Sequence, residues 1–595
     1  MHNLVIDFET YYDSKFSLSK LPTILYVRDP RCTIWGAGVQ LDDAPPLWLT
    51  NMGDLRALLA SLKEEVTIIG HNLLFDGLIL TERVGLPTGL QITWHDTLAM
   101  ARGLIATDDY SLDKLASTLT GQGKLQGILP KTAGKAALSH DELAELGRYC
   151  RQDIVACRAL YEVLEPLLPD TEKELVSITI EMGVKAQLEL DAGQLRLAIE
   201  EETAAREEAI RRAGIARSVL GSNVQFAKYL QDLGYQPPIK ISVTTGNETW
   251  AFAKGDQGWH DFKTQHPELE NLLTGREACK SSIGIDRAET LHKIALTGKL
   301  PVPLKYYGGH TGRFSGAGGG INLQNLPRTG RIRGSIKAPE GKVLLIADYA
   351  QIEARVVAWL GSEQYMLDAF SEGKDIYKAF AARLLNCEES QITKDMRQKA
   401  KSMVLGLGYG MGPRKFAENA KVGLEEAEEN VRAYRQINAG IVGFWKECKD
   451  ALNEMCDAVE AGITDYQRPW GCLTLEYKAI RFPNDMRLKF PYLHRNEDEI
   501  TFTIGSSVER IYAGKLCENL TQGLARIIMT DALRTAYKAG FNPVLTCHDE
   551  IVCLVDENRQ NELLGALASI METPPSWASD LPLEVEAKIA RNYGK

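Results

Sequence analysis

The sequence predicts a multidomain protein that combines α/β and α+β parts, and three observations support this fold class. The chain has 595 residues, which is too many for a single core. Its first part, up to about residue 165, alternates strand-like runs with helical segments, as α/β domains do. After residue 301 a strand, a long helical zone and an apolar hairpin follow one another, which is typical of an α+β domain.

Composition narrows the class of protein. The eleven cysteines are scattered without a CxxC pair, which argues against zinc sites and disulfides and suits a reducing compartment. The N-terminus MHNLVIDFET lacks the basic start of a signal peptide. No run approaches the ~20 apolar residues that span a bilayer. We therefore expect a cytoplasmic protein without a membrane partner.

The net charge of −11 speaks against a polyanionic partner, but the charge is unevenly spread. Residues 301–342 carry seven Lys or Arg residues against the single acid Glu340. Residues 392–418 carry six Lys or Arg residues against the two acids Asp395 and Glu418. Such segments can be solvated surface, or they can hold a nucleic acid.

The first part of the chain offers four acids for a metal site. The candidates are Asp7 and Glu9 in DFE, Asn72 and Asp76 in HNLLFD, and Tyr149 and Asp153 in YCRQD. The spacing in DFE puts both acids on one face of a strand, and the spacing in YCRQD is one helical turn. Converging carboxylates repel unless divalent cations neutralise them, and Mg²⁺ prefers oxygen ligands. Taken singly, each pattern is also typical of an ordinary surface strand or helix.

Together, in this order, the motifs resemble the three exonuclease motifs of DnaQ-like 3′–5′ proofreading domains. The resemblance covers residues 1 to about 165 and implies an RNase H-like fold. It also implies two Mg²⁺ ions on Asp7, Glu9, Asp76 and Asp153, a water oriented by Tyr149, and DNA beside Asn72.

The later part of the chain carries four further motifs. They are HTGRFSGAGGGINLQNLP, LLIADYAQIEARVVAWL, RQKAKSMVLGLGYG and VLTCHDEIVCLV. The second reads as a buried strand that ends at Asp348. In the third, Arg397, Lys401 and Tyr409 are spaced to share one broad helix face, and the two cations suit a triphosphate. The fourth reads as a hairpin whose turn carries His548, Asp549 and Glu550.

In their order and spacing these motifs resemble the family A (DNA polymerase I-like) DNA polymerases. The resemblance implies a right-hand polymerase with a thumb at residues 169–300 and fingers at 363–500. The palm would be split between residues 301–362 and 501–595, and the exonuclease domain would cover residues 1–168.

The resemblance also implies a role for each motif residue. Asp348, Asp549 and the backbone carbonyl of Tyr349 would bind two Mg²⁺ ions (Mn²⁺ is an alternative), with Glu550 in support. Glu353 would exclude a ribose 2′-OH. The dNTP would meet Arg397, Lys401, Leu405, Tyr409, Gly410 and Tyr377, and Lys401 could donate a proton to pyrophosphate. Primer–template DNA would contact Arg313, Asn322, Gln324, Asn325, Lys515, Gln522 and His548.

Three positions depart from the common family pattern. Leu405 stands where an aromatic ring usually packs near the sugar, Tyr377 replaces a phosphate-contacting His, and Lys515 lies near the place of an Arg. These departures favour a phage or prophage replicative polymerase. We expect a monomer that acts with accessory proteins such as a helicase and a single-strand binding protein.

Two enzymatic alternatives remain open at this level, besides a purely structural DNA-binding protein, which would leave two sets of metal acids without a role. A single-subunit RNA polymerase would share the Asp348 motif, the basic helix and the His-Asp turn, although Glu353 and the exonuclease motifs argue against it. The second enzymatic alternative is a nuclease with a degenerate polymerase-like module, although intact Asp348 and Asp549 argue against it.

Overall fold

The computed structural model describes residues 2–63, 65–123, 132–242, 246–317, 321–327, 329–497 and 499–594. Residues 318–320 of the motif HTGRFSGAGGGINLQNLP lie outside the described residues, as does Arg328. The chain divides into two compact units. Unit 1 comprises residues 1–188, 301–325 and 338–591, and unit 2 comprises residues 189–300, 326–337 and 592–595.

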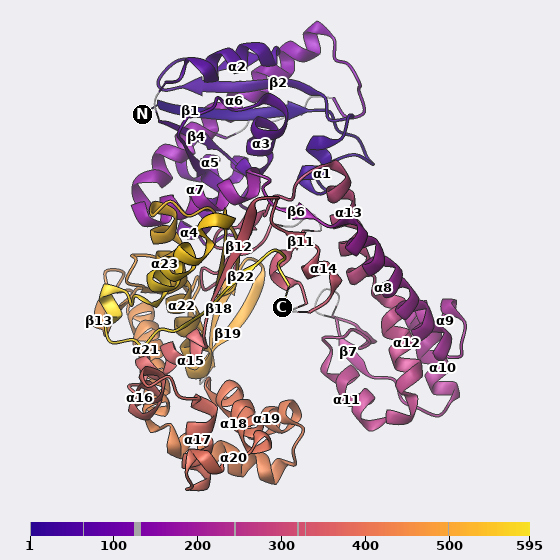
Figure 1. Cartoon of the computed structure of the whole chain (residues 1–595), viewed down its shortest axis with the longest axis vertical. Helices are drawn as coiled ribbons and strands as arrows, with labels where there is room; N and C mark the ends of the chain where they lie inside the picture. Colours follow the sequence, from indigo (N-terminus) through magenta and orange to yellow (C-terminus); the bar gives the residue numbers. More distant parts are fainter. Residues whose placement is uncertain are drawn as a thin grey trace. The chain divides into compact units, whose positions relative to one another are not determined.

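Unit 1 begins with a five-stranded sheet in the order β3-β2-β1-β4-β5. β1 pairs antiparallel with β2 and parallel with β4, and β4 is parallel to β5. The strands are β1 (His2–Thr10), β2 (Ile34–Leu41), β3 (Leu47–Leu49), β4 (Val66–Gly70) and β5 (Ile92–Asp96). The helices are α1 (Thr23–Arg28), α2 (Met52–Ser61), α3 (Leu73–Ile79), α4 (Thr97–Leu104), α5 (Leu112–Thr120), α6 (His140–Leu164) and α7 (Asp170–Val184). This arrangement confirms the α/β pattern expected for the first part of the chain (Figure 1).

Helix α6 is fixed closely against this sheet. It starts in a capping box, in which the Ser139 side chain accepts from the Glu142 N–H and the Glu142 carboxylate accepts from the Ser139 N–H. Gly38 on β2 allows the close approach, because a Cβ there would lie 2.7 Å from the Cys150 sulfur on α6. Residues on this face of α6 are therefore held next to strands β1 and β2.

The central sheet of unit 1 is antiparallel and has the order β20-β21-β12-β22. Its strands are β12 (Lys342–Tyr349), β20 (Pro543–Cys547), β21 (Glu550–Asp556) and β22 (Val585–Ala590). The predicted strand ending at Asp348 and the predicted hairpin are thus both present. Helices α15 (Ile352–Leu360), α22 (Ala513–Lys538) and α23 (Gln560–Glu572) pack against one another or against this sheet.

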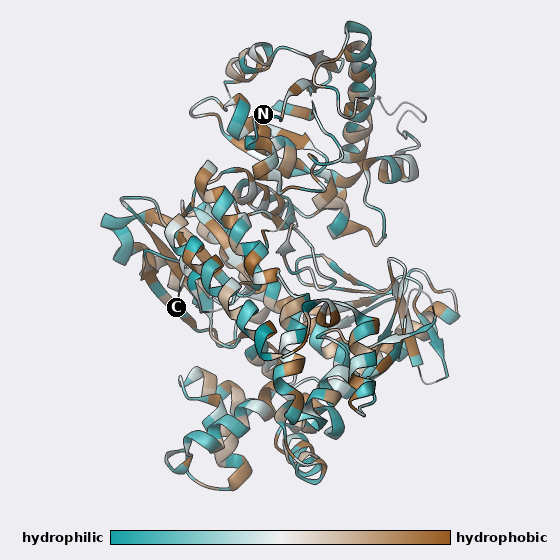
Figure 2. Ribbon diagram, turned by 90° about the vertical axis from the view of Figure 1, so that its right-hand side faces the viewer, coloured by the Kyte–Doolittle hydropathy of each residue, from teal (hydrophilic) through white to brown (hydrophobic). Residues whose placement is uncertain are grey.

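Helices make up most of residues 352–460, as the sequence predicts. They are α16 (Gln364–Ser371), α17 (Ile376–Leu385), α18 (Lys394–Leu407), α19 (Pro413–Ala420), α20 (Leu424–Ile437) and α21 (Ala439–Glu460). Short antiparallel strands follow: β13 (Gln467–Trp470), β14 (Leu473–Glu476), β15 (Ala479–Arg481), β16 (Arg487–Lys489), β17 (His494–Asn496), β18 (Glu499–Ile504) and β19 (Ser507–Ile511). Hydrophilic and hydrophobic residues alternate along the long helices (Figure 2), as expected where one face joins a core.

Unit 2 is mainly helical. Its elements are β6 (Glu189–Leu190), α8 (Ala192–Arg212), α9 (Arg217–Gly221), α10 (Asn223–Asp232), β7 (Ile239–Ile241), β8 (Glu248–Trp250), α11 (Gln257–Gln265), α12 (Glu270–Lys280), α13 (Ile283–Thr297), α14 (Arg331–Gly334) and β11 (Ile336–Lys337). An aromatic core built on Phe226, Phe252 and Trp259 holds its outer helices together, and the buried Arg276 guanidinium lies over the two Phe rings.

Two sequence-based boundaries differ from the structure. The predicted thumb began at residue 169, but residues 169–188 belong to unit 1, because α7 packs on β5 and α3. The basic helix was expected to carry Tyr409, but α18 ends at Leu407 and Gly410 has a φ of 74°. In the described part of the chain, no helix is long and apolar enough to cross a membrane.

Candidate active sites

The central sheet brings the predicted metal acids Asp348, Asp549 and Glu550 together. Asp348 lies near the end of β12 and is directly opposite Glu550, the first residue of β21. Asp549 occupies the turn before β21, and its carbonyl accepts from the N–H of Tyr349 at 3.2 Å. The preceding residue, His548, has a φ of 57° and is exposed at this turn. Acids that are about two hundred residues apart in the chain therefore meet at one edge of the sheet.

Arg313 supplies a positive charge to this group of acids. Its guanidinium donates to Glu353 Oε1 at 2.6 Å and lies 3.5 Å from Asp549 Oδ1. Burial raises the pKa of Asp549 to about 6; Arg313 opposes this rise, whereas Glu353 and Asp348 add to it. The second oxygen of Glu353 accepts from the Tyr409 hydroxyl at 2.9 Å. Glu353 is thus held between Arg313, which belongs to the TGR segment, and Tyr409, which follows the basic helix α18.

The predicted triphosphate ligands lie together on α17 and α18. Arg397 donates to Asp375 Oδ2 at 2.5 Å and lies over the Tyr377 ring, 5.2 Å from its centroid. The Lys401 Nζ is 5.7 Å from the same centroid. Leu405 is exposed, so its side chain is available to a ligand rather than part of the core.

Gly410 follows Tyr409 at the start of the next loop, close to helix α22. The close approach requires Gly514, because a Cβ there would lie 2.1 Å from the Tyr409 carbonyl oxygen. The start of α22 therefore fixes the loop that carries Tyr409 and Gly410.

Other residues predicted to contact DNA occupy two further places. Gln324 is buried in the short helix Leu323–Asn325, where its carbonyl oxygen lies 3.6 Å from the Cys547 sulfur, and Asn322 precedes it. On α22, Lys515 and Gln522 both bond to Glu518, at 3.1 and 3.2 Å. Glu518 was not among the predicted residues.

The N-terminal sheet forms a second group of acids. Asp7 and Glu9 lie on β1, and Asp76 on α3 accepts from the Phe8 N–H at 2.9 Å. Burial, and then the Asp7 charge, raise the pKa of Asp76. Asp153 is buried on α6, one turn after Tyr149.

Two residues near this second group were not predicted from the sequence. The Cys150 sulfur lies 3.4 Å from Asp7 Oδ2, and Asp7, Glu9 and Cys150 place ligand atoms within 4.8 Å of one another. Asp96 is buried and accepts from the backbone N–H of Asn72 at 2.7 Å, which fixes Asn72 with a φ of 72°. The only signal in the sequence for Cys150 was its position next to Tyr149. The only signal for Asp96 was its position at the end of a strand.

Comparisons with known proteins match this architecture. Residues 191–463 match the model of DNA polymerase family A. The DNA polymerase of Bacillus phage SP02 is 26% identical over 507 residues, which are 75% of this chain and 74% of that protein. DNA polymerase I of Aquifex aeolicus is 27% identical over 590 residues, covering 94% and 93% of the two chains.

Other matches cover different shares of each chain. DNA polymerase I of Pseudomonas aeruginosa is 26% identical over 566 residues, which are 91% of this chain but 58% of that protein. Among solved structures, the POL domain of Pol1 from M. smegmatis, in complex with DNA primer-template and dNTP, aligns with a TM-score of 0.66 at 21% identity. That alignment covers 100% of this chain and 95% of the other, and it shows a common mixed α/β fold. The similarity to DNA polymerase family A is therefore established for residues 191–463 of this chain.

Proposed function

We propose that this protein is a template-directed DNA polymerase that adds dNTPs to a primer 3′-hydroxyl. The observation that carries the proposal is the meeting of Asp348, Asp549 and Glu550 at one edge of the central sheet, in a chain that matches family A. The names of the relatives support DNA as the product, and the solved neighbour was bound to a DNA primer-template.

The acids fit a pair of Mg²⁺ ions. Asp348 and Asp549 offer hard oxygen ligands, and the pKa of Asp549 is raised first by burial and then by Glu353 and Asp348, whose negative charge a cation would offset. Bound there, the ions would neutralise the phosphates and the attacking oxygen. Glu550, opposite Asp348, and the Tyr349 carbonyl would complete the set.

The remaining residues would bind and orient the substrates. Arg397 and Lys401 would hold the triphosphate, with Tyr377 beneath both cations. The primer 3′-hydroxyl loses its proton to solvent and O3′ bonds to the α-phosphorus, while the bond from that phosphorus to the bridging oxygen breaks. Lys401 gives a proton to the departing pyrophosphate. Glu353, held by Arg313 and Tyr409, would lie against C2′ of the sugar and exclude ribonucleotides.

We further propose a 3′–5′ exonuclease in the first part of the chain, with proofreading as its role. The convergence of Asp7, Glu9 and Asp76 on β1 and α3 supports a site that also uses Asp153, Tyr149 and two Mg²⁺ ions to cleave a phosphodiester. The sheet order β3-β2-β1-β4-β5, with β2 antiparallel, supports an RNase H-like fold.

The domain proposal follows from these sites. Unit 2 would be most of a thumb, the central sheet the palm, and helices α16–α21 with the following strands the fingers. The protein would act as a monomer in phage-type DNA replication, and helicase and single-strand binding protein would be accessory partners.

Primer extension tests both activities in one assay. A labelled primer on a longer template should lengthen with Mg²⁺ and dNTPs, stay nearly unextended with rNTPs, and shorten when no nucleotide is present. Extension with rNTPs as fast as with dNTPs would favour the RNA polymerase reading. Shortening without any extension would favour a nuclease with an inactive polymerase module.

Two substitutions separate the proposed sites. Asp348→Ala should abolish extension and leave excision intact, whereas Asp7→Ala should do the reverse. Normal extension by Asp348→Ala would exclude the palm assignment, and normal degradation of single strands by Asp7→Ala would exclude the exonuclease assignment.

A further inference from the structure

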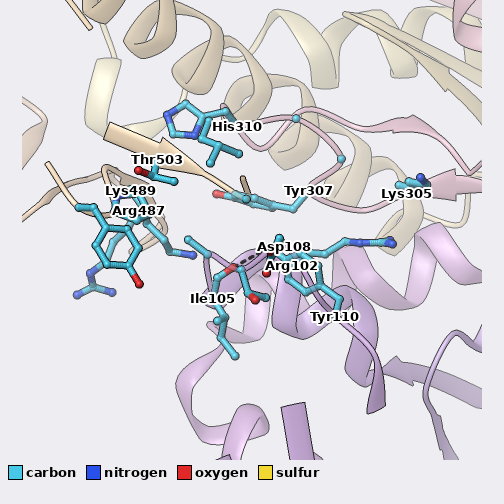
Figure 3. A pocket seen from close by; sticks show the side chains of 18 residues that line it. Arg102, Ile105, Asp108, Tyr110, Lys305, Tyr307, His310, Arg487, Lys489 and Thr503 are labelled. Atoms are coloured by element: carbon cyan, nitrogen blue, oxygen red, sulfur yellow. Dashed lines mark hydrogen bonds between the residues drawn. The ribbon is translucent and has the colours of Figure 1, made fainter. Parts of the chain in front are cut away.

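Unit 1 contains a cavity of ≈ 490 Å³ that neither group of acids lines. Its walls come from three segments: residues 102–110 at the end of α4, residues 305–310 after β9 (Leu304–Lys305), and residues 487–505 around strands β16 and β18. The volume falls within the range of about 300–1,000 Å³ that is usual for ligand sites. Figure 3 shows the side chains of these segments facing a common space.

The charged side chains of this cavity are mainly cationic. Arg102, Lys305, Arg487 and Lys489 line it, against the single carboxylate of Asp108. Arg487 is paired with Glu476 at 2.6 Å. The other three cations have no carboxylate within 4 Å among the residues that the structure describes.

Lys489 is the most informative of these cations. Its Nζ donates to the Gly103 carbonyl at 2.5 Å, which leaves its charge without a counter-ion. Burial, and then the Arg487 charge, lower the pKa of Lys489 to about 8. Holding an unneutralised ammonium in a partly buried position costs free energy, and a bound anion would remove that cost.

Tyrosine rings accompany the cations. Tyr307 and Tyr492 both line the cavity with positive φ angles, 49° and 53°, which are strained conformations for residues with a side chain. Tyr492 is 78% exposed, so its ring is open to a stacking partner. Burial lowers the pKa of the neighbouring His310 to about 4, so this residue is neutral at pH 7 and adds no charge.

We infer that this cavity binds nucleotides of a single DNA strand, with phosphates on Lys489, Arg102 and Lys305 and a base against Tyr492. Cations with interspersed tyrosines are the combination that suits phosphates joined to flat bases. A strand suits the site better than a free nucleotide, because Lys305 and Lys489 lie on opposite sides of the cavity (Figure 3) and can meet successive phosphates. The inference rests on the proposed function in DNA synthesis and adds a contact outside both acid groups.

Photochemical cross-linking tests the site on the full chain. An oligo(dT) strand in which 5-iododeoxyuridine replaces single thymidines would be irradiated with the protein in EDTA, and the cross-linked peptides would be identified by mass spectrometry. We expect a cross-link at Tyr492 or Tyr307. Lys489→Gln should lower its yield about fivefold through the lost phosphate contact. Lys538→Gln is the charge-matched control, because Lys538 is also a lysine but lies exposed at the end of α22, paired with Glu174, and it should change nothing.

The outcomes distinguish the alternatives. No cross-link in the segments that line the cavity would overturn the inference, and full displacement of the strand by an equal concentration of dTMP would overturn the assignment to a strand. The wild-type cross-link map decides the matter even if Lys489→Gln fails to fold. Normal primer extension without the cross-link would refute this site alone, whereas the cross-link without extension would refute the polymerase proposal alone.

Discussion

Asp549 illustrates how single residues make a group of acids tolerable inside a fold. Burial and two neighbouring acids disfavour its charge, and the Arg313 guanidinium partly compensates. Arg313 was predicted only as a contact to DNA, because its motif lies more than two hundred residues before Asp549 in the chain. Its bond to Glu353 adds a second role: it holds the carboxylate proposed to screen the sugar.

Replacing Glu353 should weaken the discrimination against ribonucleotides. Glu353→Ala removes the carboxylate held by Arg313 and Tyr409 and opens space for a 2′-hydroxyl. We expect kcat/KM for an rNTP relative to the matching dNTP to rise about tenfold or more, equivalent to about 1.4 kcal/mol. Single-nucleotide insertion kinetics measure this ratio. Glu372→Ala, at an exposed position after α16, is the control. A ratio like that of the control would contradict the proposed role.

Asp96→Asn should raise stability in a pH-dependent way. Burial raises the pKa of Asp96 to about 6, above the value of about 3.9 for an unfolded chain. The folded state therefore binds this proton more tightly, and that stabilisation is lost as pH rises from about 4 through about 6. We expect Asp96→Asn to gain up to about 3 kcal/mol over wild type at pH 7.5, and almost nothing at pH 4.

Calorimetric melting in EDTA across this pH range would measure the effect of Asp96→Asn. Asp54→Asn, at an exposed position in the first turn of α2, is the control and should bring no gain in stability at pH 7.5, because a negative charge is favourable there. A gain for Asp96→Asn that does not depend on pH would argue against a buried, ionised Asp96.

At the scale of elements, two helix caps offer a paired test of the proposed sites. Thr393 accepts from the Met396 N–H at the start of α18, and Ser139 accepts from the Glu142 N–H at the start of α6. Each cap contributes about 1 kcal/mol to its helix. Thr393→Ala should loosen the first turns of α18, which carry Arg397, and raise KM for dNTPs without slowing excision.

Ser139→Ala should affect the other activity, since α6 carries Tyr149 and Asp153. We expect slower excision and an unchanged KM for dNTPs. Each variant thus serves as the control for the other in primer extension and single-strand degradation. Equal effects of both variants on both activities would contradict the assignment of the two helices to separate sites.

Elements were predictable from the sequence where local patterns decide them. The apolar run before Asp348 and the β-branched runs around His548 became β12, β20 and β21. The prediction that Tyr409 lies on the basic helix was wrong, because the glycine-rich segment LGLGYG ends α18 at Leu407. The loop then allows the Tyr409 hydroxyl to reach Glu353, a contact that helical spacing does not suggest.

At the scale of the whole molecule, contacts between distant segments could not be predicted. Both groups of acids were foreseen because motifs carry them, but Cys150, Asp96 and the cavity near Lys489 depend on which elements meet. The same is true of Glu172, which was placed in a separate thumb. It lies on α7 and forms a buried ion pair with Arg526 on α22.

The Glu172–Arg526 pair should dominate the stability of the contact between α7 and α22. Arg526 Nη1 and Nη2 donate to the Glu172 carboxylate, at 2.5 and 2.7 Å, and Tyr306 and Asn484 donate to it as well. Burial alone would raise the pKa of Glu172, but the Arg526 charge and these hydrogen bonds lower it. The carboxylate is therefore fully ionised at neutral pH.

Glu172→Gln leaves the buried Arg526 without a counter-ion, which should cost about 3–5 kcal/mol. Glu174 provides the matched control: it joins the same two helices through Arg534 and Lys538 at the surface, and Glu174→Gln should cost at most about 1 kcal/mol. Replacing Glu172 and Arg526 together by Met should restore most of the loss, because no charge then remains buried. Urea unfolding would measure all three. If Glu172→Gln unfolded like Glu174→Gln, the buried pair would not hold this contact together.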